Sequence, residues 1–186
     1  MLTNMDKLYE SVAANGPVCV GLDTEISYLP TTDTAKTAGE NVVAFNRALI
    51  DATKGVAGCY KVQIAYYESL GLDGMRAYAE TLNDCASQLS GTKVYSMVIP
   101  NHSEFGVPER VRNYYEEASQ RENTMAVNNT LSASITAVDI YDALNLHNNE
   151  DIYFDTDTHW APLGAFYAYE KFCEAAGVTP TTLDSF

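Results

Sequence analysis

Short apolar runs alternate with helical patterns along this chain of 186 residues. An apolar run of a few residues predicts a buried strand, whereas apolar residues spaced three or four apart predict a helix. Strands are expected at 18–22, 60–65, 93–99 and 135–140, the first of them buried on both faces, and a short extended run is expected at 152–154. Helices are expected at 3–14, 38–53, 67–89, 107–120, 141–147 and 162–176. Such alternation is typical of α/β folds with parallel strands, and a closed (β/α)8 barrel usually needs about 250 residues. We therefore predict an open, mostly parallel, three-layer α/β sheet built from βα units.

Composition argues against several classes of function. The net charge of -14 repels nucleic-acid phosphates and anionic lipids, so neither nucleic acid nor membrane is expected as a partner. The polar N-terminal segment lacks the features of a signal peptide, and we expect a cytoplasmic protein. The four cysteines form no CxxC pair, which favours buried thiols over a metal site. No metal or cofactor is predicted.

Two charged residues are associated with the first two predicted strands, one at the end of the first strand and one inside the second. Asp23 follows the apolar run 18–22, and Lys61 lies inside the predicted strand 60–65. A charge within an apolar strand is costly unless it is paired or functional. One interpretation is an ion pair with a structural purpose. The other is a ligand site, because the carboxyl ends of parallel strands face the active site in α/β enzymes.

The blocks at 17–24, 45–53 and 61–75 resemble the first part of orotidine 5'-monophosphate decarboxylase. The resemblance implies that Asp23 and Lys61 contact the nucleotide's ribose, with Lys61 also in the catalytic network. It implies a carbon–carbon lyase of pyrimidine biosynthesis that binds OMP or UMP. That chemistry needs a carboxylate and a lysine from an Asp-x-Lys-x-x-Asp motif, which does not occur in this chain. Intact decarboxylation is therefore not expected.

A second set of residues with chemical potential is Asp157, His159 and Trp160, just before a predicted helix. The structural interpretation is a capped helix start with Trp160 in the core. The functional one is the base half of a hydrolase-type triad. Residues 76–186 resemble a DHHW family protein, related to SGNH-like polysaccharide O-acetyltransferases, with Asp-Thr-His-Trp in place of Asp-His-His-Trp. By resemblance His159 is the general base, Asp157 its partner, and the substrates are a carbohydrate and an acyl donor. Ser185 is a weak candidate for the nucleophile.

The sequence predicts two unlike segments, 1–80 and 81–186, that meet near 73–90 inside a helix or merge into one compact domain. Three hypotheses remain open: a decarboxylase-like nucleotide binder, a carbohydrate O-acetyltransferase or esterase fragment, and a non-catalytic fused or truncated open reading frame. A homodimer also remains open.

Overall fold

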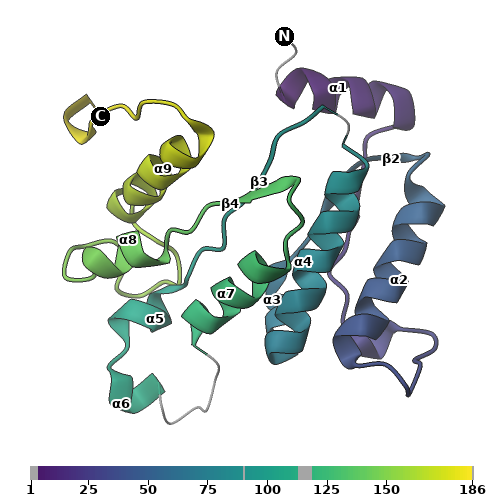
Figure 1. Cartoon of the computed structure of the whole chain (residues 1–186), viewed down its shortest axis with the longest axis horizontal. Helices are drawn as coiled ribbons and strands as arrows, with labels where there is room; N and C mark the ends of the chain where they lie inside the picture. Colours follow the sequence, from purple (N-terminus) through teal and green to yellow (C-terminus); the bar gives the residue numbers. More distant parts are fainter. Residues whose placement is uncertain (1–3, 90, 113–118, 186) are drawn as a thin grey trace. The chain divides into compact units, whose positions relative to one another are not determined.

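A computed structural model describes residues 4–89, 91–112 and 119–185 (Figure 1). The chain divides into two compact units, Met1–Cys85 and Ala86–Phe186, and each is considered by itself. Within the described ranges, none of the helices has the length and apolar character needed to cross a membrane.

The first unit is built on two parallel strands joined through a long helix. Strand β1 (Val18–Gly21) pairs with β2 (Ala57–Lys61), and α2 (Ala38–Thr53) lies between them in the chain. The remaining elements of this unit are α1 (Asn4–Asn15), the 3-10 helix η1 (Ile26–Tyr28), α3 (Ile64–Glu68) and α4 (Gly71–Ser87), whose last turn passes the boundary. The strand–helix–strand connection places the carboxyl ends of β1 and β2 at the same edge.

Helices α2 and α4 lie side by side (Figure 1). Thr37 and Glu40 form a capping box at the start of α2, which satisfies two backbone N–H groups there. Asp73 of α4 accepts a hydrogen bond from the N–H of Gly39 at 2.6 Å. Farther along, Arg47 Nε donates to Asp84 Oδ2 at 2.7 Å. The two helices are thus joined by polar contacts at their N-terminal ends and again between the middle of α2 and the last turns of α4. An apolar cluster in the same unit includes Val42, Val43, Tyr67 and Ala77.

Two expectations for these strands were wrong. The first strand is not buried on both faces: Val18 is 53% exposed and Cys19 is exposed. A two-stranded sheet leaves each strand with one free edge, so it cannot cover β1 as a larger parallel sheet would. The second strand ends at Lys61 instead of continuing to residue 65, because the chain turns into α3 and buries the Tyr67 ring.

The second unit contains another parallel pair, β3 (Val94–Ser96) with β4 (Ile135–Ala137). Its helical elements are α5 (His102–Gly106), α6 (Glu109–Arg112), α7 (Gln120–Thr130), α8 (Tyr141–Leu146), α9 (Pro162–Ala176) and the 3-10 helix η3 (Leu183–Ser185). The fold is therefore α/β with open parallel strand pairs, as expected. The strands form two separate two-stranded sheets, so the three-layer arrangement stays a prediction.

Helix α9 follows the sequence signals closely, whereas α7 was not foreseen. Pro162 opens α9, and Gly177 ends it with a left-handed φ of 71°. Residues 107–120 were expected to form one helix, but in the described part of that stretch only α6 and the first residue of α7 are helical, and 113–118 lie outside the described residues. The core of the unit gathers Val138, Ile140, Leu144, Ile152, Tyr153 and Ala168. Helices α8 and α9 lie side by side around it (Figure 1).

Candidate functional site

Asp23 and Lys61 meet at the carboxyl edge of the first strand pair. Leu22 N donates to Lys61 O at 2.8 Å, which continues the ladder one residue past β1 and sets Asp23 beside Lys61. Lys61 Nζ lies 3.2 Å from Asp23 Oδ2, and the ammonium is largely exposed. Among the described residues, the buried Asp23 Oδ1 has no hydrogen-bond partner. The pair therefore leaves one buried carboxylate oxygen whose capacity to accept a hydrogen bond is unused.

A buried polar network supports this edge of the sheet. The Tyr67 hydroxyl donates to Leu22 O at 2.7 Å and accepts from Asn46 Nδ2 at 2.9 Å. Asn46 Oδ1 also accepts from the Thr24 hydroxyl at 2.6 Å, and Thr81 Oγ1 lies 3.2 Å from Asn46 Nδ2. Burial raises the pKa of Tyr67 to about 12. The network fixes the segment on both sides of Asp23 without contacting the carboxylate itself.

A hairpin-like turn presents the second predicted site. Tyr153 and Trp160 form an isolated antiparallel bridge, and Phe154 N donates to His159 O at 3.2 Å. Ile152, at the start of the short extended run expected at 152–154, accepts a backbone hydrogen bond from Ala161 N at 2.8 Å. Trp160 packs against the core of the unit, as the structural interpretation required, but the expected side-chain cap is wrong, because Ala161 stands at the N-cap of α9. The turn therefore exposes Asp157 and His159 to solvent, and the bridge at its start fixes its position.

Asp157 and His159 form the carboxylate–imidazole pair that the sequence suggested. His159 Nδ1 lies 2.6 Å from Asp157 Oδ1, and the same oxygen accepts from the backbone N–H of His159 at 3.1 Å. The hydrogen bond from the His159 side chain lowers the pKa of Asp157. An ionised carboxylate only accepts hydrogen bonds, so it selects the tautomer with the proton on Nδ1 and leaves Nε2 basic. The His159 side chain is 78% exposed, so Nε2 is open to a substrate.

Ser185, the weak candidate for the nucleophile, has another partner, and so do the neighbouring residues His102 and Ser103, which offer an imidazole and a hydroxyl. The Ser185 hydroxyl of η3 lies 3.0 Å from Thr182 Oγ1. The Ser103 hydroxyl donates to Asn101 Oδ1 at 2.6 Å, and the His102 ring stacks on Tyr153. In the described part of the chain, no hydroxyl or thiol is hydrogen-bonded to His159 Nε2. The nucleophile that a full triad requires is thus not identified.

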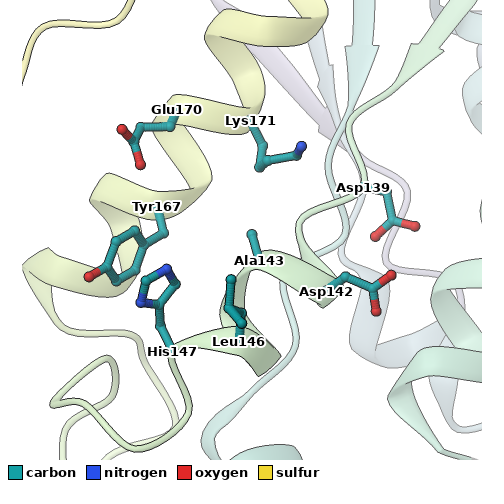
Figure 2. A pocket seen from close by; sticks show the side chains of 8 residues that line it. All are labelled: Asp139, Asp142, Ala143, Leu146, His147, Tyr167, Glu170 and Lys171. Atoms are coloured by element: carbon teal, nitrogen blue, oxygen red, sulfur yellow. The ribbon is translucent and has the colours of Figure 1, made fainter.

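The second unit also contains a pocket of about 480 Å³ between α8 and α9, which the sequence did not indicate. Figure 2 shows the His147 and Tyr167 rings together at one end and the carboxylates of Asp139 and Asp142 at the other. The rings stack with centroids 3.7 Å apart. Glu150 lies 2.7 Å from His147 Nδ1 and accepts from the Tyr167 hydroxyl at 2.6 Å. This hydrogen bond raises the pKa of Tyr167 to about 12. The pocket carries the carboxylates of Asp139, Asp142 and Glu170 on a largely apolar lining and contains neither Asp157 nor His159.

Comparison with known proteins gives one family match that extends over both units. The family model described as DHHW protein matches residues 6–186. The chain belongs to the DHHW family. A crystal structure of a DHHW family protein from Eubacterium siraeum is 38% identical, with a TM-score of 0.53, over 59% of this chain and 36% of that one. In the present chain the motif expected from the resemblance reads Asp157-Thr158-His159-Trp160.

This chain is also similar, near its N-terminus, to part of an enzyme. Orotidine 5'-phosphate decarboxylase from Clostridium kluyveri is 54% identical over 82 residues, which cover 42% of this chain and 28% of that enzyme. The decarboxylase from Clostridium perfringens is 54% identical over 80 residues with the same coverage. The chain thus matches about 28% of the length of these curated relatives. Both resemblances expected from the sequence are confirmed.

Sequence reasoning missed the residues that act through tertiary contacts. Asn46 and Tyr67 lie far apart in the chain and on helices whose apolar patterns hide a polar network. The three-residue spacing of His147 and Glu150 was a readable signal, but nothing in the sequence brings Tyr167 onto the His147 ring. The pocket between α8 and α9 could therefore not be inferred from residue patterns alone.

Proposed function

We propose that the second unit supplies the base for acyl transfer to or from carbohydrate hydroxyls, as an O-acetyltransferase or esterase would use it. The observation that carries this proposal is the 2.6 Å contact between His159 Nδ1 and Asp157 Oδ1. The pair leaves Nε2 free to take a proton from the attacking hydroxyl of a sugar, a serine or water. Asp157 holds the tautomer and stabilises the imidazolium that forms.

The accessibility of the pair supports a large, hydroxyl-rich substrate. Both side chains are more than half exposed, and they stand on a turn that is fixed by the Tyr153–Trp160 bridge. A polysaccharide can approach such a projecting turn, whereas a buried pair would admit only a small molecule.

Acetate release from an O-acetylated xylo-oligosaccharide tests the proposal, with 4-nitrophenyl acetate as a second substrate. Positioned general bases contribute about 10²–10⁴-fold to rates, so His159→Ala should lower the rate by about that factor. Asp157→Asn should also lower it, because the tautomer is no longer fixed.

His147→Ala is the matched control. His147 is also paired with a carboxylate, at 2.7 Å from Glu150, but belongs to the separate pocket. It should keep the wild-type rate. Equal losses in the His147 and His159 variants, or a His159→Ala rate equal to that of wild type, would refute the assignment. A wild-type chain that releases no acetate from either substrate would also count against it.

A second candidate function is recognition of a nucleoside monophosphate at the first unit. The specific observation is the unpartnered, buried Oδ1 of Asp23 beside Lys61, within the segment that is 54% identical to orotidine 5'-phosphate decarboxylases. Asp23 would accept a ribose hydroxyl, and Lys61 would hold the sugar and the charged ligand. Decarboxylation is not proposed, because the chain lacks an Asp-x-Lys-x-x-Asp motif.

Titration of the full chain with UMP, followed by NMR or calorimetry, tests this second function. Binding should be lost in Lys61→Ala and Asp23→Asn. Lys54→Ala is the matched control, since Lys54 is a similarly exposed lysine paired with Asp51. No UMP binding by the wild type, or the same loss in the Lys54 variant, would reject the site.

A further inference from the structure

Two cysteines face each other across the strands of the first unit. Cys19 of β1 is the register partner of Cys59 of β2. Neighbouring strands lie about 4.8 Å apart, and disulfides span Cα separations of about 4.4–6.8 Å. Side chains of register partners leave the sheet on the same face. The two sulfurs can therefore be joined without separating the strands.

The surroundings of the pair make it reachable from solvent. Cys19 is exposed and Cys59 is partly exposed, in contrast to Cys173, which is buried in α9. A hydrogen bond with Cys19 raises the pKa of the Cys59 thiol, which agrees with direct contact between the sulfurs. Cys59 is thereby held as a thiol while the more exposed sulfur of Cys19 is open to a reagent.

We propose that Cys19 and Cys59 form a redox-active dithiol, which a low-molecular-weight disulfide such as oxidised glutathione converts reversibly into a cross-strand disulfide. The Cys19 thiolate attacks one sulfur of the external disulfide, forming a mixed disulfide and releasing one external thiol. Cys59, as thiolate, then attacks the Cys19 sulfur, and the second external thiol leaves. Two protein thiols are oxidised, one external disulfide is reduced to two thiols, and the two protein protons end on the released thiols.

The position of the bridge gives it a consequence for the fold. Strand side chains alternate between faces, so Cys59 and Lys61 share a face one repeat apart. The disulfide would covalently hold β1 to β2 next to the Asp23–Lys61 pair and close the chain segment that contains α2. A two-stranded sheet is marginal by itself, so a bond across it fixes the register of the two strands. Exposed or strained bridges are reduced readily, which makes this bond reversible.

Peptide mapping of the full chain tests the proposal. The native protein is incubated with oxidised glutathione, remaining thiols are blocked, and the unreduced chain is cut with trypsin. The four cysteines fall in four different tryptic peptides, 8–36, 55–61, 77–93 and 172–186. The expected product is peptide 8–36 linked to 55–61, and dithiothreitol should separate the two again.

Variants and unfolded protein complete the experiment. Cys59→Ser should stop at a glutathione adduct on Cys19, and the double variant Cys85→Ser, Cys173→Ser should still form the bridge. Oxidation in concentrated urea should lose the preference for the Cys19–Cys59 product, because only the fold sets the register. The proposal is overturned if the native protein accumulates glutathione adducts without bridging, or if it forms other pairings as often as the protein in urea.

Discussion

Removing one buried hydroxyl should destabilise the first unit measurably. The Tyr67→Phe variant keeps the ring but loses the oxygen that donates to Leu22 O at 2.7 Å and accepts from Asn46 Nδ2 at 2.9 Å. Tyr67 and Leu22 are fully buried, and Asn46 is 1% exposed. Water therefore cannot replace the lost partner in the native packing.

The expected loss in the free energy of unfolding follows from the two groups that lose a partner, Leu22 O and Asn46 Nδ2. Each net hydrogen bond contributes about 0.5–1.5 kcal/mol, and a buried group without a partner costs about 1–3 kcal/mol. Asn46 keeps its contacts with Thr24 and Thr81, which limits the loss on that side. We expect the free energy of unfolding to fall by about 2–4 kcal/mol, a large fraction of the roughly 5–15 kcal/mol of a typical domain.

Hydrogen exchange under mild urea is the suitable assay, because it reports on each of the two compact units separately. Protection of the amides in β1 and α2 should fall in Tyr67→Phe, while that of α9 should not change. Tyr9→Phe is the matched control, since Tyr9 is 76% exposed and its variant should stay within about 0.5 kcal/mol of wild type. A Tyr67→Phe protein as stable as the Tyr9→Phe control would refute the role of the network.

Two further predictions concern pH and packing. The pKa of Tyr67 is raised from 10.0 to about 12, so its contribution to stability is complete below pH 10 and is lost as the pH rises through 12. Urea titrations across this window should show a decline in the first unit that is smaller in Tyr67→Phe; identical declines would contradict the assignment. Gly164→Ala should destabilise the second unit by about 1–3 kcal/mol in thermal unfolding, because the added Cβ would collide with the Ile152 carbonyl oxygen. Gly55→Ala, where nothing lies within 4 Å of the new Cβ, should be neutral, and equal effects of the two would argue against the collision.

Local sequence signals predicted several elements because their causes are local. The helix over 162–176 was confirmed by α9, since Pro162 at the start and Gly177 at the end act through their own backbone angles. The helix over 38–53 was confirmed by α2 for the same reason, with a capping box at Thr37. Helix α7 was missed because its mean polarity is high and its apolar pattern is weak.

The length and burial of the strands depended on neighbouring elements in the tertiary structure that cannot be identified from the sequence. The run at 18–22 has the composition of a strand buried on both faces, yet β1 has one neighbour and Val18 is exposed. Residues 62–65 were expected to continue the second strand, but the chain turns after Lys61 so that Tyr67 can enter the core. Burial on both faces requires covering layers, and these are a property of the whole fold.

The sequence by itself determined the α/β class and the two family resemblances, and by resemblance it suggested the pairing of Asp157 with His159, which lie close enough in the chain to meet through a local turn. Tertiary structure alone decided which distant groups meet. It brought Lys61 within 3.2 Å of Asp23, placed Cys19 opposite Cys59, and stacked His147 on Tyr167. Each of these contacts joins elements whose register and packing are set by the apolar core, and the identity of the residues in contact carries no signal of that register.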